Sequence, residues 1–152
     1  MKLVVDSSTI IRGLFRKFTE PAYIVDRIAD NSYQLLMTEE MAKELLIAIY
    51  IACRAAKLDE SSTKKYLRAI ATFTLAAQKV KIRTKFTSCS DPDDNMFIEC
   101  AINGKAKYCI SSDPSIYTIK SYCKNQHELN LIKDIDFFNP EKFYEHITKV
   151  KK

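Results

Sequence analysis

Two aspartates each follow an apolar run that has the length of a buried β-strand. Asp6 follows residues 3–5, and Asp113 follows residues 108–111. In open parallel sheets, ligands bind beyond the carboxyl ends of the strands, so both carboxylates would lie at one site. Either aspartate alone could instead cap the next turn, as aspartate often does.

Two further carboxylates fall on the inner faces of predicted helices. Glu44 shares a helical face with four apolar residues, Met41, Ala48, Ile51 and Ala55. Asp94 shares one with Ile98 and Ala101. A carboxylate in an apolar stripe is unfavourable unless it is paired or bound to a metal. Glu44 could otherwise bend out to solvent, and Asp94 could be an ordinary first-turn residue favoured by the helix dipole.

If Asp6, Glu44, Asp94 and Asp113 converge, their charges repel one another. Two unit charges about 4 Å apart repel by roughly 4 kcal/mol at an effective dielectric of about 20. A hard divalent cation removes that repulsion, and oxygen ligands without His or Cys favour Mg²⁺ or Mn²⁺ over zinc. Such a site suits phosphodiester hydrolysis, because the metal activates water and stabilises the attacking and leaving oxygens.

Basic residues offer a surface for a phosphate backbone. Residues 80–86 alternate between apolar and polar types, which predicts a half-exposed strand with one charged face. That face carries Lys79, Lys81, Arg83 and Lys85. Four cations in line could follow RNA phosphates, or could protect an edge strand from aggregation. Arg12 and Arg16, one helical turn apart after Asp6, could also reach phosphate or be ordinary surface residues.

The elements that position these side chains alternate along the chain. Strands are predicted at residues 3–5, 33–37, 80–86, 108–111 and near 131–132. Helices are predicted after Ser7 or Ser8 as a cap, from Pro21 to Asn31, and over residues 38–56, 62–77, 93–103, 116–123 and 140 onward. Gly104 is expected as the C-cap of the helix that carries Asp94. This alternation indicates an α/β fold with a mainly parallel sheet, and 152 residues suit one domain.

Composition narrows the classes of function. The two glycines form no glycine-rich phosphate loop, and a net charge of +5 is compatible with a polyanionic partner without requiring one. Five cysteines without a CxxC pair indicate a reducing compartment and argue against a disulfide framework or a zinc site. Asp6 interrupts the first apolar run too early for a signal peptide, and the longest run, residues 45–53, is too short to span a membrane. These features predict a cytoplasmic chain.

Five segments, taken in order, resemble the motifs of PIN-domain proteins, the family that includes VapC-type toxins. The segments are residues 4–8, 38–45, 91–101, 108–113 and 139–143. The first is similar to the family's opening strand and first catalytic aspartate, and the second to the motif with an acidic ligand, here Glu44. The third, which reads DPDDNMFIECA, is the most specific and is similar to a bacterial and archaeal subgroup described as toxin components.

The resemblance implies a three-layer α/β/α sandwich around a short, mainly parallel sheet, formed by residues 1–152. It implies Mg²⁺ or Mn²⁺ bound by four catalytic residues, Asp6, Glu44, Asp94 and Asp113, with Ser8, Glu99 and Ser111 as auxiliary groups. It also implies endoribonuclease activity on RNA, a homodimer and, in toxins, inhibition by a small antitoxin that fills the groove.

Two positions depart from the family pattern. Ser8 stands where the first motif often carries a polar amide, and Ser115 where a second acidic residue often follows the last aspartate. These departures leave metal stoichiometry and the level of activity open, so a catalytically weak module that binds RNA or protein remains an alternative. An aspartyl phosphotransfer enzyme is disfavoured, because Ser8 occupies the place of the second aspartate that such phosphatases require.

Overall fold

Apolar residues at the start of the chain form β1 (Lys2–Val5), whose last three residues are buried. In the computed structural model, which describes residues 1–150, β1 lies at the centre of a five-stranded sheet of order β3-β2-β1-β4-β5. The other strands are β2 (Gln34–Met37), β3 (Gln78–Lys79), β4 (Tyr108–Ile110) and β5 (Asp136–Phe138). Every pairing is parallel, so the carboxyl ends of the strands meet at one edge of the sheet.

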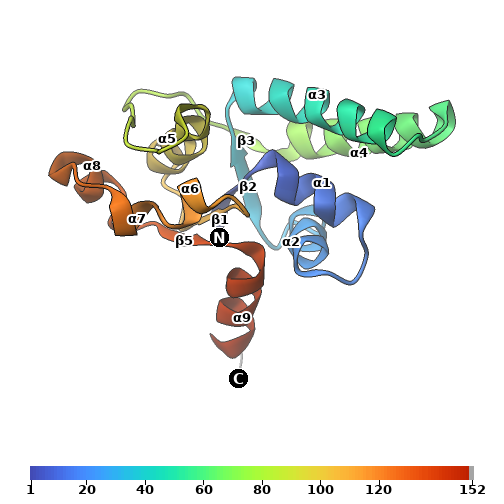
Figure 1. Cartoon of the computed structure of the whole chain (residues 1–152). Helices are drawn as coiled ribbons and strands as arrows, with labels where there is room; N and C mark the ends of the chain where they lie inside the picture. Colours follow the sequence, from blue (N-terminus) through green and yellow to red (C-terminus); the bar gives the residue numbers. More distant parts are fainter. Residues whose placement is uncertain (151–152) are drawn as a thin grey trace.

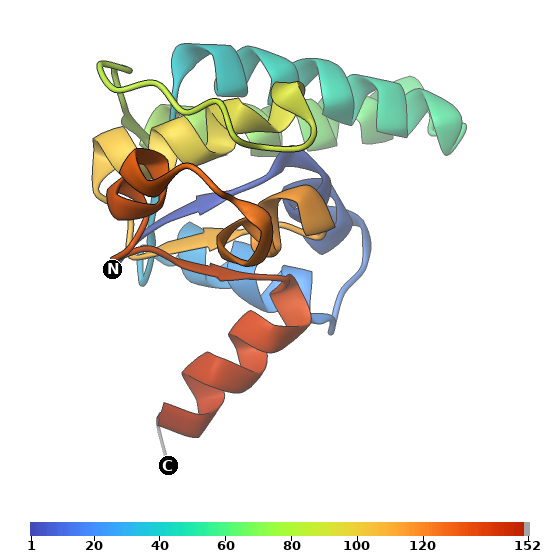
Figure 2. The ribbon, with the colours of Figure 1, turned by 60° about the vertical axis from the view of Figure 1, so that its left-hand side comes forward.

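Helices cover both faces of this sheet. The helices that complete the described fold are α1 (Ser7–Phe15), α2 (Glu20–Ala29), α3 (Glu39–Ala55), α4 (Glu60–Ala76), α5 (Asn95–Gly104), α6 (Pro114–Tyr117), α7 (Ile119–Tyr122), α8 (Gln126–Leu131) and α9 (Pro140–Val150). In Figure 1, α3 and α4 form a long antiparallel pair that extends away from the strands. Figure 2 shows α3, α4 and α5 above the sheet and α2 and α9 below it. This arrangement confirms the predicted three-layer α/β/α sandwich. Residues 151–152 of the predicted domain lie outside the described residues.

The ends of several helices are set by the residues that the sequence singled out. Thr38 caps α3 by accepting a hydrogen bond from the Met41 amide at 3.1 Å, and Asn31 follows α2 with a φ of 63°. The first helix differs from the prediction, because its cap is Asp6 rather than Ser7 or Ser8. Both serines already lie within α1, and the Asp6 backbone is extended, as an N-cap requires.

Two predicted strands are wrong in position. β3 ends at Lys79, before the strand predicted at residues 80–86, and the Asn103 side chain bonds part of that backbone in place of a neighbouring strand. Its Oδ1 accepts from the amides of Arg83 and Thr84, both at 2.9 Å, and its Nδ2 donates to the Thr84 carbonyl at 2.8 Å. The strand predicted near 131–132 is instead the end of α8, since so short an apolar pair fits a helix equally well.

Gly104 is the last residue of α5, and its predicted role as the C-cap belongs to Lys105, which has a φ of 56°. A Cβ at Gly104 would lie 2.7 Å from Leu36 Cδ1 and 2.9 Å from Val80 Cγ2. The position therefore needs glycine because α5 packs closely against β2, and not because of its backbone conformation.

The five cysteines are all free and buried. Among the residues that the structure describes, no helix combines the length and the apolar character that crossing a membrane requires.

Candidate active site

Asp6 and Asp113 are joined through one serine at the carboxyl ends of β1 and β4. The Ser111 hydroxyl donates to Asp6 Oδ2 and accepts from the Asp113 amide at 3.0 Å. The Asp6 carboxylate, on a residue that is 6% exposed, also accepts from the Thr9 amide at 3.0 Å and from the Ser8 hydroxyl at 3.3 Å. Neighbouring strands thus hold the two aspartates at the sheet edge where parallel sheets bind ligands.

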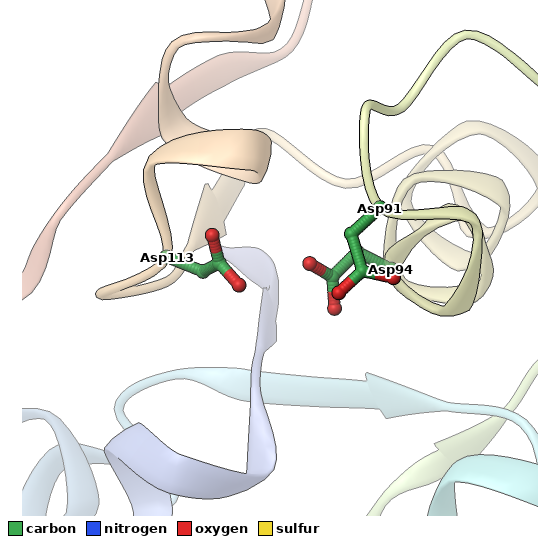
Figure 3. Close-up of side chains that lie close together, drawn as sticks. All are labelled: Asp91, Asp94 and Asp113. Atoms are coloured by element: carbon green, nitrogen blue, oxygen red, sulfur yellow. The ribbon is translucent and has the colours of Figure 1, made fainter.

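Three carboxylates form a close group beside this edge. One oxygen each of Asp91, Asp94 and Asp113 lies within 4.8 Å of the others. Figure 3 shows the Asp113 side chain, from the turn after β4, facing the other two across a gap. Asp91 and Asp94 come from the segment before α5, where a short 3-10 helix (Pro92–Asp94) makes the two side chains point the same way. The fold therefore brings residues from two distant segments to one acidic centre.

The group is electrostatically strained. Burial, reinforced by the carboxylates of Asp113 and Asp91, raises the pKa of Asp94 to about 6. The Ser115 hydroxyl opposes this rise by donating to Asp94 Oδ2 at 2.6 Å. The backbone amide of Ser115, which donates to Asp113 Oδ1 at 2.9 Å, holds the pKa of Asp113 below its ordinary value. As the pH rises, Asp113 therefore loses its proton before Asp94 does.

Asp91 is the member of the group that sequence analysis did not single out as a ligand. Its side chain also caps the 3-10 helix by accepting from the Asp93 amide at 3.1 Å. Because an aspartate before proline commonly marks a turn, its place in the sequence does not by itself indicate a metal ligand. The sequence signal was that three of the four residues 91–94 are acidic. A tight turn in this segment would bring two of these side chains to one point.

Glu44 lies outside the group of three, on α3. The predicted apolar stripe through Ile51 is wrong, because Ile51 is 60% exposed. The buried face of α3 consists instead of Met41, Ala42, Leu45, Ile49 and Cys53. Glu44 stands beside that face and lines a groove that also includes Asp93 and Glu99. Partial burial, then the charges of Glu40, Asp6 and Asp93, raise its pKa, so Glu44 lies within electrostatic reach of Asp6.

Other residues named from the sequence lie around this centre. Glu99 accepts from the Phe86 amide at 3.2 Å and pairs with Lys85 at 3.8 Å. It therefore holds residues 79–86, the basic segment, against α5. Arg12 donates to the hydroxyl of Ser112, the residue before Asp113, at 2.7 Å and pairs with Glu141 at 3.6 Å. Arg16 lies exposed at the end of α1.

Residues 87–90, which lead into Asp91, are held by the C-terminal part of the chain. Glu128 on α8 is only 6% exposed and accepts from the Thr87 amide at 2.8 Å, the Thr87 hydroxyl at 2.7 Å and the Ser88 hydroxyl at 3.1 Å. The Tyr122 hydroxyl accepts from the Ser90 amide at 3.1 Å. Sequence analysis missed Glu128 because the pattern Asn125-x-x-Glu128 resembles a local helix cap.

The donor set fits a hard divalent cation. Carboxylate oxygens alone, crowded enough to raise the pKa of Asp94, form a site whose repulsion a cation would relieve. Asp91, Asp94 and Asp113 would hold it, and Asp6 lies one serine away from Asp113. Such an arrangement can bind a phosphate oxygen through the cation and direct a water molecule at phosphorus.

Comparison with known proteins identifies a family and a relative for this chain. The family model described as "PIN domain" matches residues 2–115. The uncharacterized protein MJ1680 of Methanocaldococcus jannaschii is 24% identical over 151 residues, which cover 98% of this chain and 93% of that protein. No solved structure matches the chain significantly.

Proposed function

Because this chain belongs to the PIN domain family, we propose that it is a Mg²⁺- or Mn²⁺-dependent endoribonuclease that hydrolyses RNA phosphodiester bonds. Family membership supports nuclease activity in general, and the choice of metal and of RNA is our inference. The observation that carries the proposal is the convergence of Asp91, Asp94 and Asp113 beside Asp6 at the carboxyl edge of the sheet.

Each residue of the centre has a distinct task in this proposal. Asp94 and Asp113, assisted by Asp6 and Asp91, hold the cation, and Glu44 completes the acidic rim of the groove. A bound divalent cation supplies a Lewis acid that polarises the phosphodiester and lowers the pKa of water. Ser111 orients the Asp6 carboxylate, since its hydroxyl is itself fixed by the Asp113 amide.

The test is RNA cleavage by the purified chain in Mn²⁺, in Mg²⁺ and in chelator. We expect cleavage only with metal and its loss in Asp6→Asn. Asp134→Asn is a matched control, because Asp134 is exposed and lines a hollow at the opposite, amino-terminal side of the sheet. Full activity in chelator, or an active Asp6→Asn variant that keeps the fold by circular dichroism, would falsify the proposal.

A catalytically weak module that binds RNA or protein on the same fold is the second candidate. The observation that favours it is Ser115, whose hydroxyl occupies an oxygen of Asp94 at 2.6 Å where the family often supplies another acid. The module would retain RNA on a filter without cleaving it, and Asp94→Asn would leave that retention unchanged. Metal-dependent cleavage at the same protein concentration would exclude it.

A role as the toxin of a toxin–antitoxin pair, with a small antitoxin partner, remains a finer prediction from the family resemblance. The homodimer, the single domain over residues 1–152 and the cytoplasmic location are further predictions. The five free cysteines support the cytoplasmic location. Growth arrest on expression, relieved by Asp6→Asn, would support the toxin role. Normal growth on expression of a chain that cleaves RNA in vitro would contradict the toxin role.

A further inference from the structure

Five cations line a hollow of about 340 Å³ that lies away from the acidic centre. They are Lys2, Lys79, Lys81, Arg83 and Lys105, and no Asp or Glu is among the residues that line it. None of the five takes part in the ion pairs found among residues 1–150. A concave surface with uncompensated positive charge attracts polyanions.

The hollow reaches the amino-terminal side of the sheet at Lys2 and Lys105, whereas Lys79 pairs with Met37 at the end of β2. Lys2 begins β1 and Asp6 follows its end, and Lys105 follows the end of α5, whose first turn adjoins Asp94. In Figure 2 the strands run from left to right and α5 runs back, so the N-terminus and the end of α5 lie at the left. At about 3.3 Å per strand residue and 1.5 Å per helical residue, both paths separate Lys2 and Lys105, at the far end of the hollow, from the acidic centre by roughly 13–15 Å.

The basic segment joins these two places. Exposed Lys81, Arg83 and Lys85 alternate with inward residues until Phe86, which lines the groove that contains Glu44. Asn103 fixes this segment through the amides of Arg83 and Thr84 and is itself tied to the Glu99 carbonyl at 2.8 Å. The backbone that carries these charges is therefore held in place before a ligand arrives, which reduces the entropy lost on binding.

Protection of an edge strand does not account for this cluster. Lysines on β3 would serve that purpose, because β3 is the edge of the sheet. Lys2 belongs to the central strand β1, and Lys105 belongs to the end of a helix. Cations from β1, from β3 with the residues after it, and from the end of α5 thus face one hollow. Of these elements only β3 is an edge strand.

We propose that this hollow is a second contact site for the RNA, which binds backbone phosphates several nucleotides from the scissile bond. The inference rests on the proposed nuclease function and deepens it, because it makes the substrate an RNA long enough to reach both sites. A stacked strand advances about 3.4 Å per nucleotide, so the far end of the hollow is roughly four nucleotides from the acidic centre. Shorter RNAs reach only the acidic centre.

The experiment measures binding separately from cleavage. RNA of about two nucleotides and RNA about ten times longer are titrated in Mg²⁺ against the Asp6→Asn protein, over a series of salt concentrations. The test variant adds Lys81→Gln and Arg83→Gln to that protein. The control adds Lys65→Gln and Arg68→Gln, which remove the same charge from exposed positions on α4.

We expect the test pair to weaken binding of the long RNA by about tenfold and to reduce its salt slope by about 1.4, since each phosphate contact contributes about 0.7 for a single strand. Binding of the short RNA and binding by the control pair should not change. An equal loss for short and long RNA, or for the control pair, would overturn the inference. A test variant that no longer binds polyglutamate but binds the long RNA as before would also overturn the inference, because the hollow would then bind an acidic protein.

Cleavage distinguishes this inference from the proposed function. In a background with Asp6 intact, the test pair should still cleave the short RNA at the wild-type rate and should cleave the long RNA with a raised KM. Absence of cleavage in the unmodified chain would contradict the nuclease proposal but would leave the length-dependent binding measurable on its own.

Discussion

Ser115 donates a hydrogen bond of 2.6 Å from its hydroxyl to the carboxylate of Asp94. The two residues come from different segments, since Asp94 precedes α5 and Ser115 lies in the first turn of α6. This bond opposes burial and the neighbouring aspartates, which still raise the pKa of Asp94 to about 6. Ser115 therefore keeps more of Asp94 ionised near neutral pH than its surroundings alone would allow.

Replacing this serine should shift the acidic limb of the pH–rate profile. In Ser115→Ala the ionised form of Asp94 loses a donor, so its pKa rises and the limb moves to higher pH by up to about one unit. The measurement is kcat/KM between pH 5 and 8 (about the range in which such groups titrate). Ser121→Ala is the control, because that hydroxyl donates to the Thr118 carbonyl on the outer surface. A shift toward lower pH, or an equal shift in the control, would contradict the assigned role.

Metal binding should weaken as the pH falls through about 6, the pKa of Asp94. A proton on this carboxylate competes with the cation, so the apparent affinity for Mn²⁺ should fall by up to about tenfold per pH unit below that value. Because a ligand that binds only the native state stabilises it, saturating Mn²⁺ should raise the melting temperature by about 5–10 °C at neutral pH.

Thermal melts with and without Mn²⁺ measure this effect. The rise should shrink at pH 5 (about one unit below the pKa of Asp94) and should disappear in Asp94→Asn at either pH. Asp134→Asn should behave as the unmodified chain. A rise that is the same at both pH values, or that survives Asp94→Asn, would show that the metal binds elsewhere.

Glu128 should make stability depend on pH. Burial alone would raise its pKa, but the hydrogen bonds from Thr87 and Ser88 outweigh burial and lower the pKa below 4.5. A lowered pKa means that the contribution to stability is complete above the unfolded value and is lost as the pH falls through the folded one. Glu128→Gln removes a charged acceptor of three donors and should reduce the free energy of unfolding at neutral pH by about 1–3 kcal/mol.

Urea unfolding at neutral and at acidic pH tests the role of Glu128. The unmodified chain should lose more stability on acidification than Glu128→Gln, because only the former has this carboxylate to protonate. Glu145→Gln is the control, since Glu145 makes only exposed ion pairs on α9. If both variants respond to pH as the unmodified chain does, Glu128 does not hold the loop through its charge.

The parallel core was predictable because its strands are continuous apolar runs. Leu3 and Cys109 illustrate this, since both are fully buried in runs that match β1 and β4. The exceptions were places where a side chain replaced the sheet. Residues 80–86 keep the predicted alternation of exposure, yet Asn103 rather than a neighbouring strand bonds part of their backbone. A hydrogen bond between residues twenty positions apart produces no periodic pattern in the sequence.

For the candidate site, the order of motifs located Asp6, Asp94 and Asp113, and their roles as ligands remain predictions. The relation of Glu44 to the core was wrong because apolar residues such as Ile47 and Ile51 face outward, so the apolar pattern of α3 is wider than its buried face. Asp91 and Glu128 escaped notice because each also fits a local capping role. Their long-range contacts depend on how loops fold back, which spacing alone does not encode.

The residues matched by the family make structural contacts with residues beyond the match. The match ends at residue 115, yet β5 completes β4, and the Phe138 carbonyl accepts from the Ser111 amide at 3.0 Å. A truncation there would leave the outer edge of β4 bare, free the loop before Asp91 from its buried anchor, and invite strand-to-strand aggregation. The tail is thus a scaffold for the aspartates, and designs that graft or shorten this fold need to retain it.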